Sequence, residues 1–227
     1  MKRVYFLAAL ALASFLCVPQ LAKADDIPQT IGNALAITPG AVLGAATFNT
    51  DVAGQPAPFD KIYGGPNSNF SESWTFNSYI IPAGDTLTAA TITIGLWMSP
   101  LATNTSPVAS FILDGTYNLT ALLNTEVGAV GSGKNTYEVY TISLTDGALA
   151  ALASGSAMFS LSLQGPGNGV LAGGTPDLAG GLAFSTLDMT GQSGSTPVPE
   201  PSTIALLLIG IAGLRSKRLS RNQSWHL

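Results

Sequence analysis

Few side chains in this 227-residue chain could carry out nucleophilic or acid–base chemistry. The only histidine is His226, next to the last residue, and the only cysteine is Cys17, near the first. The body of the chain therefore lacks the imidazole that a Ser-His-Asp or Cys-His arrangement requires. Histidine and cysteine are also the usual ligands of zinc, so a zinc site of that type is excluded there as well.

Carboxylates are the remaining candidates for chemistry. A pair of them can hydrolyse a glycosidic bond, and loop carboxylates together with carbonyl groups can bind calcium. The candidates are Asp51, Asp60, Glu72 and Asp85, which lie mostly among turn-forming residues, where solvated side chains are the rule. No Asp-x-Asp spacing defines a ligand set. We therefore expect no enzymatic activity and no cofactor, and we leave calcium open without naming ligands.

The charge is divided unevenly along the chain. Only 10% of the residues are charged, against about 25% in a typical soluble protein. All thirteen acidic residues lie between Asp25 and Glu200, and only Lys61 and Lys134 oppose them there, which leaves that part with eleven net negative charges. Because an acidic body repels phosphate backbones, we expect no nucleic-acid binding.

Residues 1–24 have the three parts of a secretory signal peptide: a positive start, an apolar stretch, and an Ala-x-Ala site at Ala22 and Ala24. We expect signal peptidase to cut after Ala24. Cys17 follows a leucine, whereas a lipoprotein signal has a small residue there, so Cys17 is expected to leave with the signal. The mature chain then contains no cysteine and no disulfide, and its fold must rest on its hydrophobic core.

The C-terminal region joins a proline-rich motif, an apolar stretch and a basic cluster. The apolar residues 202–214 would form a helix about 20 Å long, shorter than the roughly 30 Å hydrocarbon core of a membrane. The positive residues that follow hold the end of the chain in the cytoplasm by the positive-inside rule; they are Arg215, Lys217, Arg218 and Arg221. This pattern predicts a marginal transmembrane helix with the acidic body outside.

The order of these parts resembles the PEP-CTERM sorting signal of Gram-negative bacteria, with Val198, Pro199, Glu200 and Pro201 as the motif. The resemblance implies recognition by an exosortase, a membrane transpeptidase-like enzyme, removal of the helix and basic residues, and a link with exopolysaccharide and the cell surface. The same C-terminal pattern is also catalogued as an ice-binding protein C-terminal domain. That label predicts no ice binding here, because the threonines of segment 86–93 are not repeated further along the chain.

Segments between the two ends alternate apolar and polar residues with period two, as half-buried strands do. In segment 91–98 one face is apolar, with Trp97 among the residues of the opposite face; the apolar residues are Ile92, Ile94, Leu96 and Met98. Segment 73–81 places Trp74, Phe76 and Ile80 on one face. The pair Asp114-Gly115 indicates a hairpin that joins two further strands.

We therefore expect an all-β fold, an antiparallel β-sandwich that is jelly-roll-like, over residues 25–190. Segment 41–48 is expected as an early strand, segment 116–123 as the second strand of the hairpin, and segment 145–155 as the one helical interruption. The expected core includes Phe76, Ile92, Ile94, Phe111 and Leu161. Residues 191–197 are predicted to be a flexible linker, 198–221 the sorting signal, and 222–227 a tail of unassigned role.

These features predict an exported, non-catalytic protein of the cell surface or extracellular matrix. Its expected partners are signal peptidase, an exosortase-type enzyme, the membrane through the C-terminal helix, and exopolysaccharide. The alternative is a carbohydrate-binding module of the lectin type, in which exposed Trp97, Tyr79 or Tyr140 would stack on sugar rings. Buried positions for these aromatic residues would favour the structural role instead.

Overall fold

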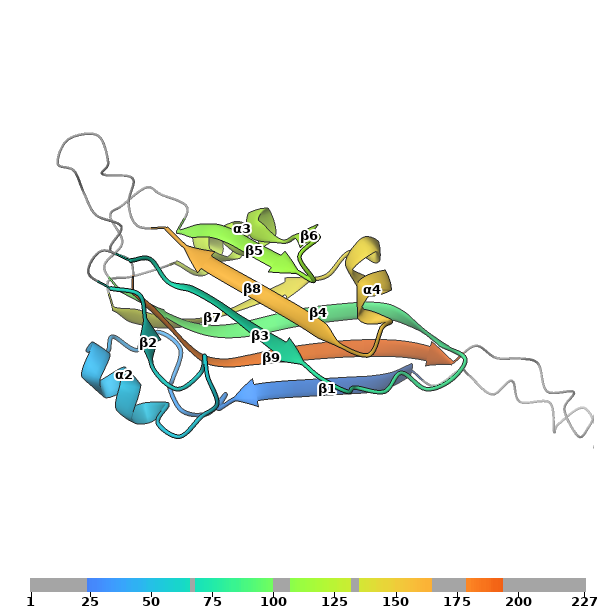
Figure 1. The fold of residues 1–227 in the computed structure, drawn as a ribbon, viewed down its shortest axis with the longest axis horizontal. Coiled ribbons are helices and arrows are strands. Elements are labelled where there is room, and N and C mark those ends of the chain that lie inside the picture. Colours follow the sequence, from blue (N-terminus) through green and yellow to red (C-terminus); the bar gives the residue numbers. More distant parts are fainter. Residues whose placement is uncertain (1–23, 66–67, 100–106, 132–134, 165–178, 194–227) are drawn as a thin grey trace, which may run out of the picture. The chain divides into compact units, whose positions relative to one another are not determined.

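The computed structural model describes residues 24–65, 68–99, 107–131, 135–164 and 179–193, which belong to one compact unit, Ala24–Ser193 (Figure 1). Its strands are β1 (Ala24–Gly32), β2 (Ile62–Tyr63), β3 (Ser71–Phe76), β4 (Asp85–Met98), β5 (Val108–Leu113), β6 (Tyr117–Asn118), β7 (Thr136–Ser143), β8 (Ala157–Leu163) and β9 (Gly180–Ser193). The helices within the described ranges are α2 (Ala45–Asp51), α3 (Thr120–Val130) and α4 (Asp146–Leu152).

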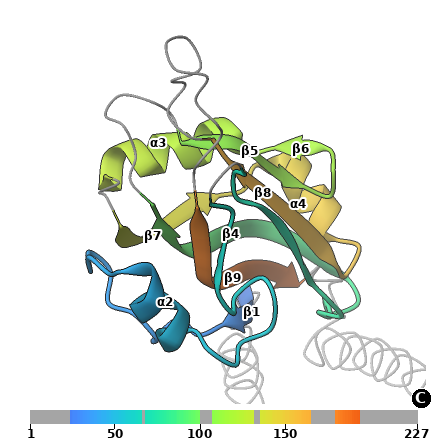
Figure 2. The same ribbon diagram turned by 60° about the vertical axis from the view of Figure 1, so that its left-hand side comes forward.

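The strands form two antiparallel sheets. The first has the order β1-β9-β4-β7, with β2 paired to the beginning of β9, and the second has the order β3-β8-β5-β6. Figure 2 shows the sheets as two layers. The expected all-β class is therefore confirmed. No helix in these ranges is long and apolar enough to cross a membrane, and the apolar segment 202–214 lies outside them.

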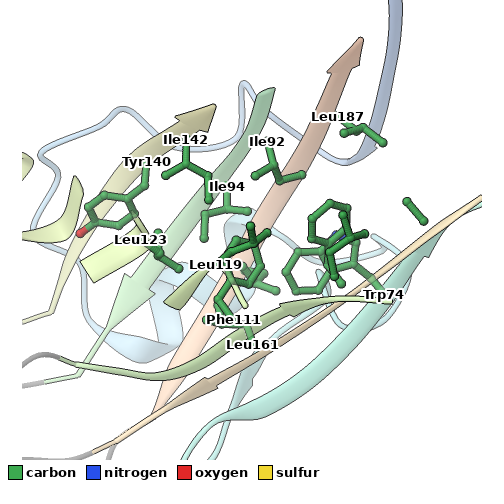
Figure 3. Close-up of a cluster of buried hydrophobic side chains, with 14 of the residues drawn as sticks. Trp74, Ile92, Ile94, Phe111, Leu119, Leu123, Tyr140, Ile142, Leu161 and Leu187 are labelled. Carbon is green, nitrogen blue, oxygen red and sulfur yellow. The ribbon is translucent and has the colours of Figure 1, made fainter. Parts of the chain in front are cut away.

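The main hydrophobic core lies between the two sheets (Figure 3). Trp74 of β3 and Phe111 of β5 both stack against Phe159 of β8, with ring centroids 6.0 Å and 5.7 Å apart. Aliphatic residues of the first sheet, among them Ile92 and Ile94, face these rings. The five core residues expected from the alternation are all buried. Because side chains on a strand alternate between its two faces, period two alone was enough to identify them.

A second hydrophobic cluster lies on the opposite face of the first sheet, beneath α2. Trp97 of β4 packs against Phe48 of α2, with ring centroids 5.9 Å apart, and its indole Nε1 donates a hydrogen bond of 3.0 Å to the Leu43 carbonyl. The buried members are Ile37, Phe48, Val52, Trp97, Tyr137, Ala183 and Phe184. Segment 36–52 therefore adds a third layer over one part of the sheet.

Two segments expected as strands are helical. Segment 41–48 leads into α2, and the hairpin strand after Asp114-Gly115 is only two residues long before α3 begins. Phe48 of α2 and Val52, which directly follows the helix, are buried and four positions apart. In and before α3 the buried residues Leu119, Leu123 and Val127 repeat at the same spacing. A spacing of four places apolar groups on one face of a helix, and this stripe outweighs the short alternation on which the strand predictions were based.

The hairpin turn lies at Asp114-Gly115 as expected, but Thr116 is a third loop residue, because Leu113 pairs with Tyr117. Asp114 and Gly115 both have positive φ, 50° and 67°, and the Thr116 N–H donates to the Leu113 carbonyl at 3.1 Å. Positive φ at both central residues is typical of the two-residue hairpin turn whose twist matches that of the strands. The prediction for Ile80 is wrong, because β3 ends at Phe76 and Ser78 has φ of 60°, so Ile80 is 80% exposed.

The threonines of segment 86–93 are interrupted by a β-bulge. The register of β4 against β9 shifts between Leu87 and Ala89, so Thr88 is the extra residue. Leu87 packs against the core before the bulge and Ala90 is buried after it. A bulge moves the side chains that follow to the other face of the sheet. The threonines on the two sides of Thr88 therefore do not continue one alternating series.

Strands β1 and β9 join the two ends of the unit. They pair over the full length of β1, from Ala24 opposite Gln192 to Gly32 opposite Phe184. Strand β9 also pairs with β4 as far as Ser193, opposite Asp85. It therefore extends three residues past 190, where the sequence analysis placed the end of the domain. Backbone pairing with β1 and β4 holds these last residues in the strand. Apolar alternation could not indicate this, because Gly191 and Gln192 have no apolar side chain.

Candidate functional site

The residues predicted to direct sorting lie outside the described part of the chain. This holds for Val198, Pro199, Glu200 and Pro201, for the basic residues Arg215, Lys217, Arg218 and Arg221, and for Ala22. Ala24 is the first residue of β1. The structure thus gives the positions at which the chain enters and leaves the folded unit. Ala24 is paired with Gln192, so these two positions are neighbours at one end of the first sheet.

Two of the four candidate carboxylates, Asp60 and Glu72, lie close enough to affect each other, which the sequence did not indicate. The Tyr63 hydroxyl donates a hydrogen bond of 2.6 Å to the Asp60 carboxylate, and the Lys61 ammonium lies 5.2 Å from the centre of the Tyr63 ring. Burial raises the pKa of Glu72 above its usual value, and the negative charge of Asp60 raises it further, whereas Lys61 lowers it. Asp60 and Glu72 therefore interact electrostatically.

Tyr63 is affected by the same group of charges. Burial raises the pKa of its hydroxyl to about 12, and the hydrogen bond to Asp60 and the charges of Asp60 and Glu72 act in the same direction. Deprotonation would place a phenolate beside a carboxylate, so the hydroxyl remains a donor at neutral pH. In the described ranges no three Asp, Glu, His or Cys residues are grouped so that they could hold a metal ion.

The other two candidate carboxylates lie apart from this pair. Asp51 is the last residue of α2, and Asp85 is the first residue of β4. Asp85 borders a groove of about 590 Å³ between the start of β4 and α4, lined mainly by apolar residues. These are Ile81, Pro82, Leu87, Leu149, Ala150 and Ala153, together with Asp85 and Thr86.

The chemistry that this groove offers is simple. The Asp85 Oδ2 atom is buried and has no hydrogen-bond partner among the described residues. Because this oxygen is not accessible from solvent, the groove offers mainly apolar walls and no assigned hydrogen-bond acceptor. Of the four candidate carboxylates Asp85 alone lines it, so no carboxylate pair of the glycosidase type is formed there from those four.

The three aromatic residues proposed for sugar stacking are all buried. Trp97 is 2% exposed, Tyr79 4% and Tyr140 1%. The Tyr79 hydroxyl donates to the Leu152 carbonyl at 2.7 Å, and the Tyr140 hydroxyl donates to the Gly131 carbonyl at 3.0 Å. The exposed rings that the lectin alternative requires at these three positions are therefore not present. Alternation placed Trp97 correctly on the face opposite the main core, but it could not show that α2 covers that face.

Comparison with known proteins identifies the C-terminal region. No curated protein matches the chain. A family profile for the PEP-CTERM protein-sorting motif matches residues 197–218, which include the Val-Pro-Glu-Pro sequence, the apolar segment, and Arg215, Lys217 and Arg218. This match confirms the resemblance seen in the sequence. The motif indicates an exported protein that is anchored in the membrane before processing and is recognised by an exosortase-type enzyme. The chain is therefore an exported protein that carries a PEP-CTERM protein-sorting motif at residues 197–218.

Proposed function

We propose that the protein is a non-catalytic component of the cell surface or the extracellular matrix, associated with exopolysaccharide and delivered there by its sorting motif. The observation that carries the proposal is the PEP-CTERM match at residues 197–218. The sequence supports the non-catalytic role, because its body contains no histidine or cysteine. No cofactor is required by this role, and calcium stays open without assigned ligands.

The fold is proposed to be jelly-roll-like. When the two-residue β2 is left aside, the first sheet contains the first, eighth, third and sixth strands of the chain, and the second sheet contains the second, seventh, fourth and fifth. Strands that follow each other therefore lie in opposite sheets, except β5 and β6, which form the hairpin. Two Greek keys folded together produce this order. Such a domain is a stable carrier that needs no disulfide.

Carbohydrate binding by aromatic stacking receives no support from the described residues. The three side chains that could have formed a stacking surface are part of the hydrophobic clusters instead. Burial of these aromatic residues was the outcome expected for a structural protein. We therefore favour the surface or matrix role over the lectin alternative.

The mechanism of sorting follows from the chemistry of the motif and the residues after it. Pro199 and Pro201 fix their own φ angles and bias the preceding residues away from helix, which keeps the motif extended. A short apolar helix over 202–214, stopped by the basic cluster, would leave Glu200 just outside the membrane. A membrane-embedded enzyme could then reach an extended motif at the outer surface. The signal peptide of residues 1–24 would start this export.

The proposal is tested by changing the motif and measuring the product. In a host that carries the sorting enzyme, the Glu200→Ala/Pro201→Ala variant should be exported but remain uncleaved in the membrane fraction. The control is Ser195→Ala/Thr196→Ala, which changes two residues just before the matched region and should be processed like wild type. The measurement is the mass and the membrane fraction of each product. Wild-type processing of the Glu200/Pro201 variant would show that this motif does not direct sorting.

The basic cluster is tested separately. Replacing Arg215, Lys217 and Arg218 by glutamine removes three of the four positive charges that should hold the end of the chain in the cytoplasm. The expected product is full-length protein, released without processing. If this variant is instead processed at the wild-type rate, the cluster has no role in stopping the chain in the membrane.

A further inference from the structure

We propose that the apolar groove between the start of β4 and α4 is a docking surface for the sorting enzyme, which places an apolar side chain there while it holds the C-terminal motif. The inference rests on the proposed function, because it uses recognition of the motif by an exosortase-type enzyme. It adds a second contact, on the folded unit, to the contact with the motif itself.

The groove lies at the end of the first sheet from which the chain continues toward the motif. Its lining residues Asp85 and Leu87 belong to the beginning of β4, where they are paired with Ser193 and Gly191 of β9. Ser193 is the last residue of β9. Figure 1 shows the end of β9, the start of β4 and α4 toward the same end of the described unit. The groove is therefore beside the point at which the chain leaves the sheet.

The chain between the sheet and the motif is short. Strand β9 ends at Ser193 and the motif begins at Val198, so residues 194–197 separate them. Four residues span at most about 14 Å when extended. An enzyme that holds the motif therefore lies next to this end of the folded unit, and the surface around the groove is within its reach. A contact there benefits from the high effective concentration that a short connection provides.

The surface around the groove is apolar and open to solvent. The groove has a volume of about 590 Å³, and Ala150 and Ala153 on its α4 side are exposed. Ile80, which directly precedes the lining residue Ile81, is 80% exposed. Exposed apolar surface next to a groove marks a site of contact with another molecule. Because the lining is mainly apolar, the group that fits it is an apolar side chain.

The charge of the protein favours the enzyme over two other occupants, the membrane surface and a second copy of the chain. The part from Asp25 to Glu200 carries eleven net negative charges, and anionic lipid headgroups repel a body of that charge. A second copy carries the same charge and is repelled as well. An apolar side chain on an uncharged part of the enzyme meets neither obstacle.

Charged side chains in the groove test the proposal in the full-length protein, in a host that carries the sorting enzyme. Ala150→Lys and Ala150→Glu should both be processed about fivefold more slowly than wild type, because either charge opposes burial of an apolar group. The controls are Ala46→Lys and Ala46→Glu at an exposed position of α2, which covers the opposite end of β9 beside Gly181. They should be processed like wild type. Pulse-chase labelling measures the rates, and urea unfolding of the purified variants verifies that they are folded.

The outcomes separate the docking surface from the sorting motif. Wild-type rates for both Ala150 variants would overturn the proposal. Faster processing with lysine and slower processing with glutamate would also overturn it, because attraction to an anionic membrane would then explain the rates. If the wild-type protein is not processed at the motif, the proposed function itself fails, and this result is distinct from an effect confined to the Ala150 variants.

A photo-crosslinking side chain identifies the occupant directly. The full-length protein carries p-benzoylphenylalanine in place of Ala153, or in place of Ala46 as the control, and its membranes are irradiated while processing takes place. Position 153 should give an adduct between this chain and the sorting enzyme, whereas position 46 should give none. Mass spectrometry identifies the partner in each adduct. An adduct of two copies of this chain, an adduct with lipid alone, or equal capture of the enzyme from both positions would overturn the proposal.

Discussion

The outer face of the first sheet consists of two regions that share strands but differ in side chains. In the open region Thr30, Thr186, Thr93 and Thr141 form one row across β1, β9, β4 and β7. The oxygen atoms of Thr30 and Thr186, and those of Thr93 and Thr141, are each 2.9 Å apart. The covered region lies two to four residues away along β9, β4 and β7. Its outward side chains are Phe184, Trp97 and Tyr137, and α2 lies over them.

The difference shows which sequence feature indicates that a further layer, here the segment with α2, covers one part of a sheet. Along β4 the outward positions are Thr91, Thr93, Gly95 and Trp97, so the change from hydroxyl to apolar groups marks where the cover begins. Gly95 lies at the boundary because a Cβ there would be 2.1 Å from the Tyr137 hydroxyl oxygen and 2.6 Å from the Phe184 ring. Alternation identifies a face, but only the residue types along that face reveal whether it is covered.

The largest expected effect is the loss of the ring that fills the covered region. Phe48 is fully buried against Trp97 and Gly181, so Phe48→Ala should lower the free energy of unfolding by about 3–5 kcal/mol. The matched substitution in the open region, Thr141→Ala, removes only the hydroxyl pair with Thr93 and should lower it by no more than about 1 kcal/mol. Urea unfolding of both variants provides the comparison. Similar values for the two variants would show that the cover contributes nothing to stability.

Gly95→Ala tests the boundary between the two regions. The added methyl group must displace the Tyr137 or Phe184 side chain, so we expect a loss of about 1–3 kcal/mol in unfolding free energy. Gly128 of α3 is the control, because a Cβ there meets no atom within 4 Å. In a helix the same substitution stabilises by about 0.5–1 kcal/mol. Thermal melts should therefore shift in opposite directions, and a shift of the same sign would contradict the proposed crowding.

Each of the two hydrophobic clusters contains one buried tyrosine of β7, and the two hydroxyl groups differ in their hydrogen bonding. Tyr140, in the main core, donates to Gly131, so Tyr140→Phe should cost about 0.5–1.5 kcal/mol. The Tyr137 hydroxyl, in the covered region, is buried and has no partner among the described residues, so Tyr137→Phe should be neutral or stabilising. Chemical denaturation of the two variants decides this. A clear loss of stability in Tyr137→Phe would indicate a bound water or another partner.

These tyrosines also make the fold sensitive to alkali. Burial raises the pKa of both the Tyr137 and the Tyr140 hydroxyl above the usual value of 10.0, and it raises the pKa of Tyr79 to about 12. Because the folded state favours the neutral hydroxyl, the stability from this preference is complete below pH 10 and is lost as the pH rises further. Unfolding measured between about pH 9 and 12 should show the decline. Tyr137→Phe should reduce it, and an unchanged pH profile would contradict this assignment.

The smallest expected effect concerns the hydroxyl row of the open region. A double-mutant cycle with Thr93→Val and Thr141→Val isolates the interaction between the two side chains. Cross-strand threonine pairs contribute about 0.2–1 kcal/mol, and the 2.9 Å separation places this pair within that range. The cycle with Thr93→Val and Ser143→Val serves as the control, since Thr93 is opposite Thr141 and not Ser143. A coupling of the same size in both cycles would show that the hydrogen bond is not its source.

The fold could be predicted from the sequence wherever a strand has one buried and one solvated face. Ile92, Ile94 and Leu161 were recognised as core residues because their neighbours along the chain are threonine, serine or glycine. The prediction failed where other periods or turns intervened, as for α3, whose buried residues are four positions apart, and for Ile80, which follows a turn at Ser78. Strand β1 was missed because Ile27 and Ile31, its two large apolar residues, are four positions apart and show no alternation with period two.

The candidate sites divide in the same way. The sorting motif could be recognised because its prolines, apolar segment and basic cluster follow one another directly in the sequence, and the family match confirms it. The surroundings of Asp60 and Glu72, and the groove beside Asp85, could not be foreseen, because each is formed by segments that meet only in the folded chain. The burial of Trp97 could not be foreseen for the same reason, since its cover comes from a segment about fifty residues earlier.

The sequence by itself determined the all-β class, the main core and the sorting motif, because alternation, turn residues and charge act between residues that are close in the chain. Only the tertiary structure decided that Thr30 lies beside Thr186, 156 residues away, that α2 covers Trp97, and that Ala24 and Asp25 are paired with β9. Such pairings depend on the combined free energy of many weak contacts between distant segments, which no local pattern records.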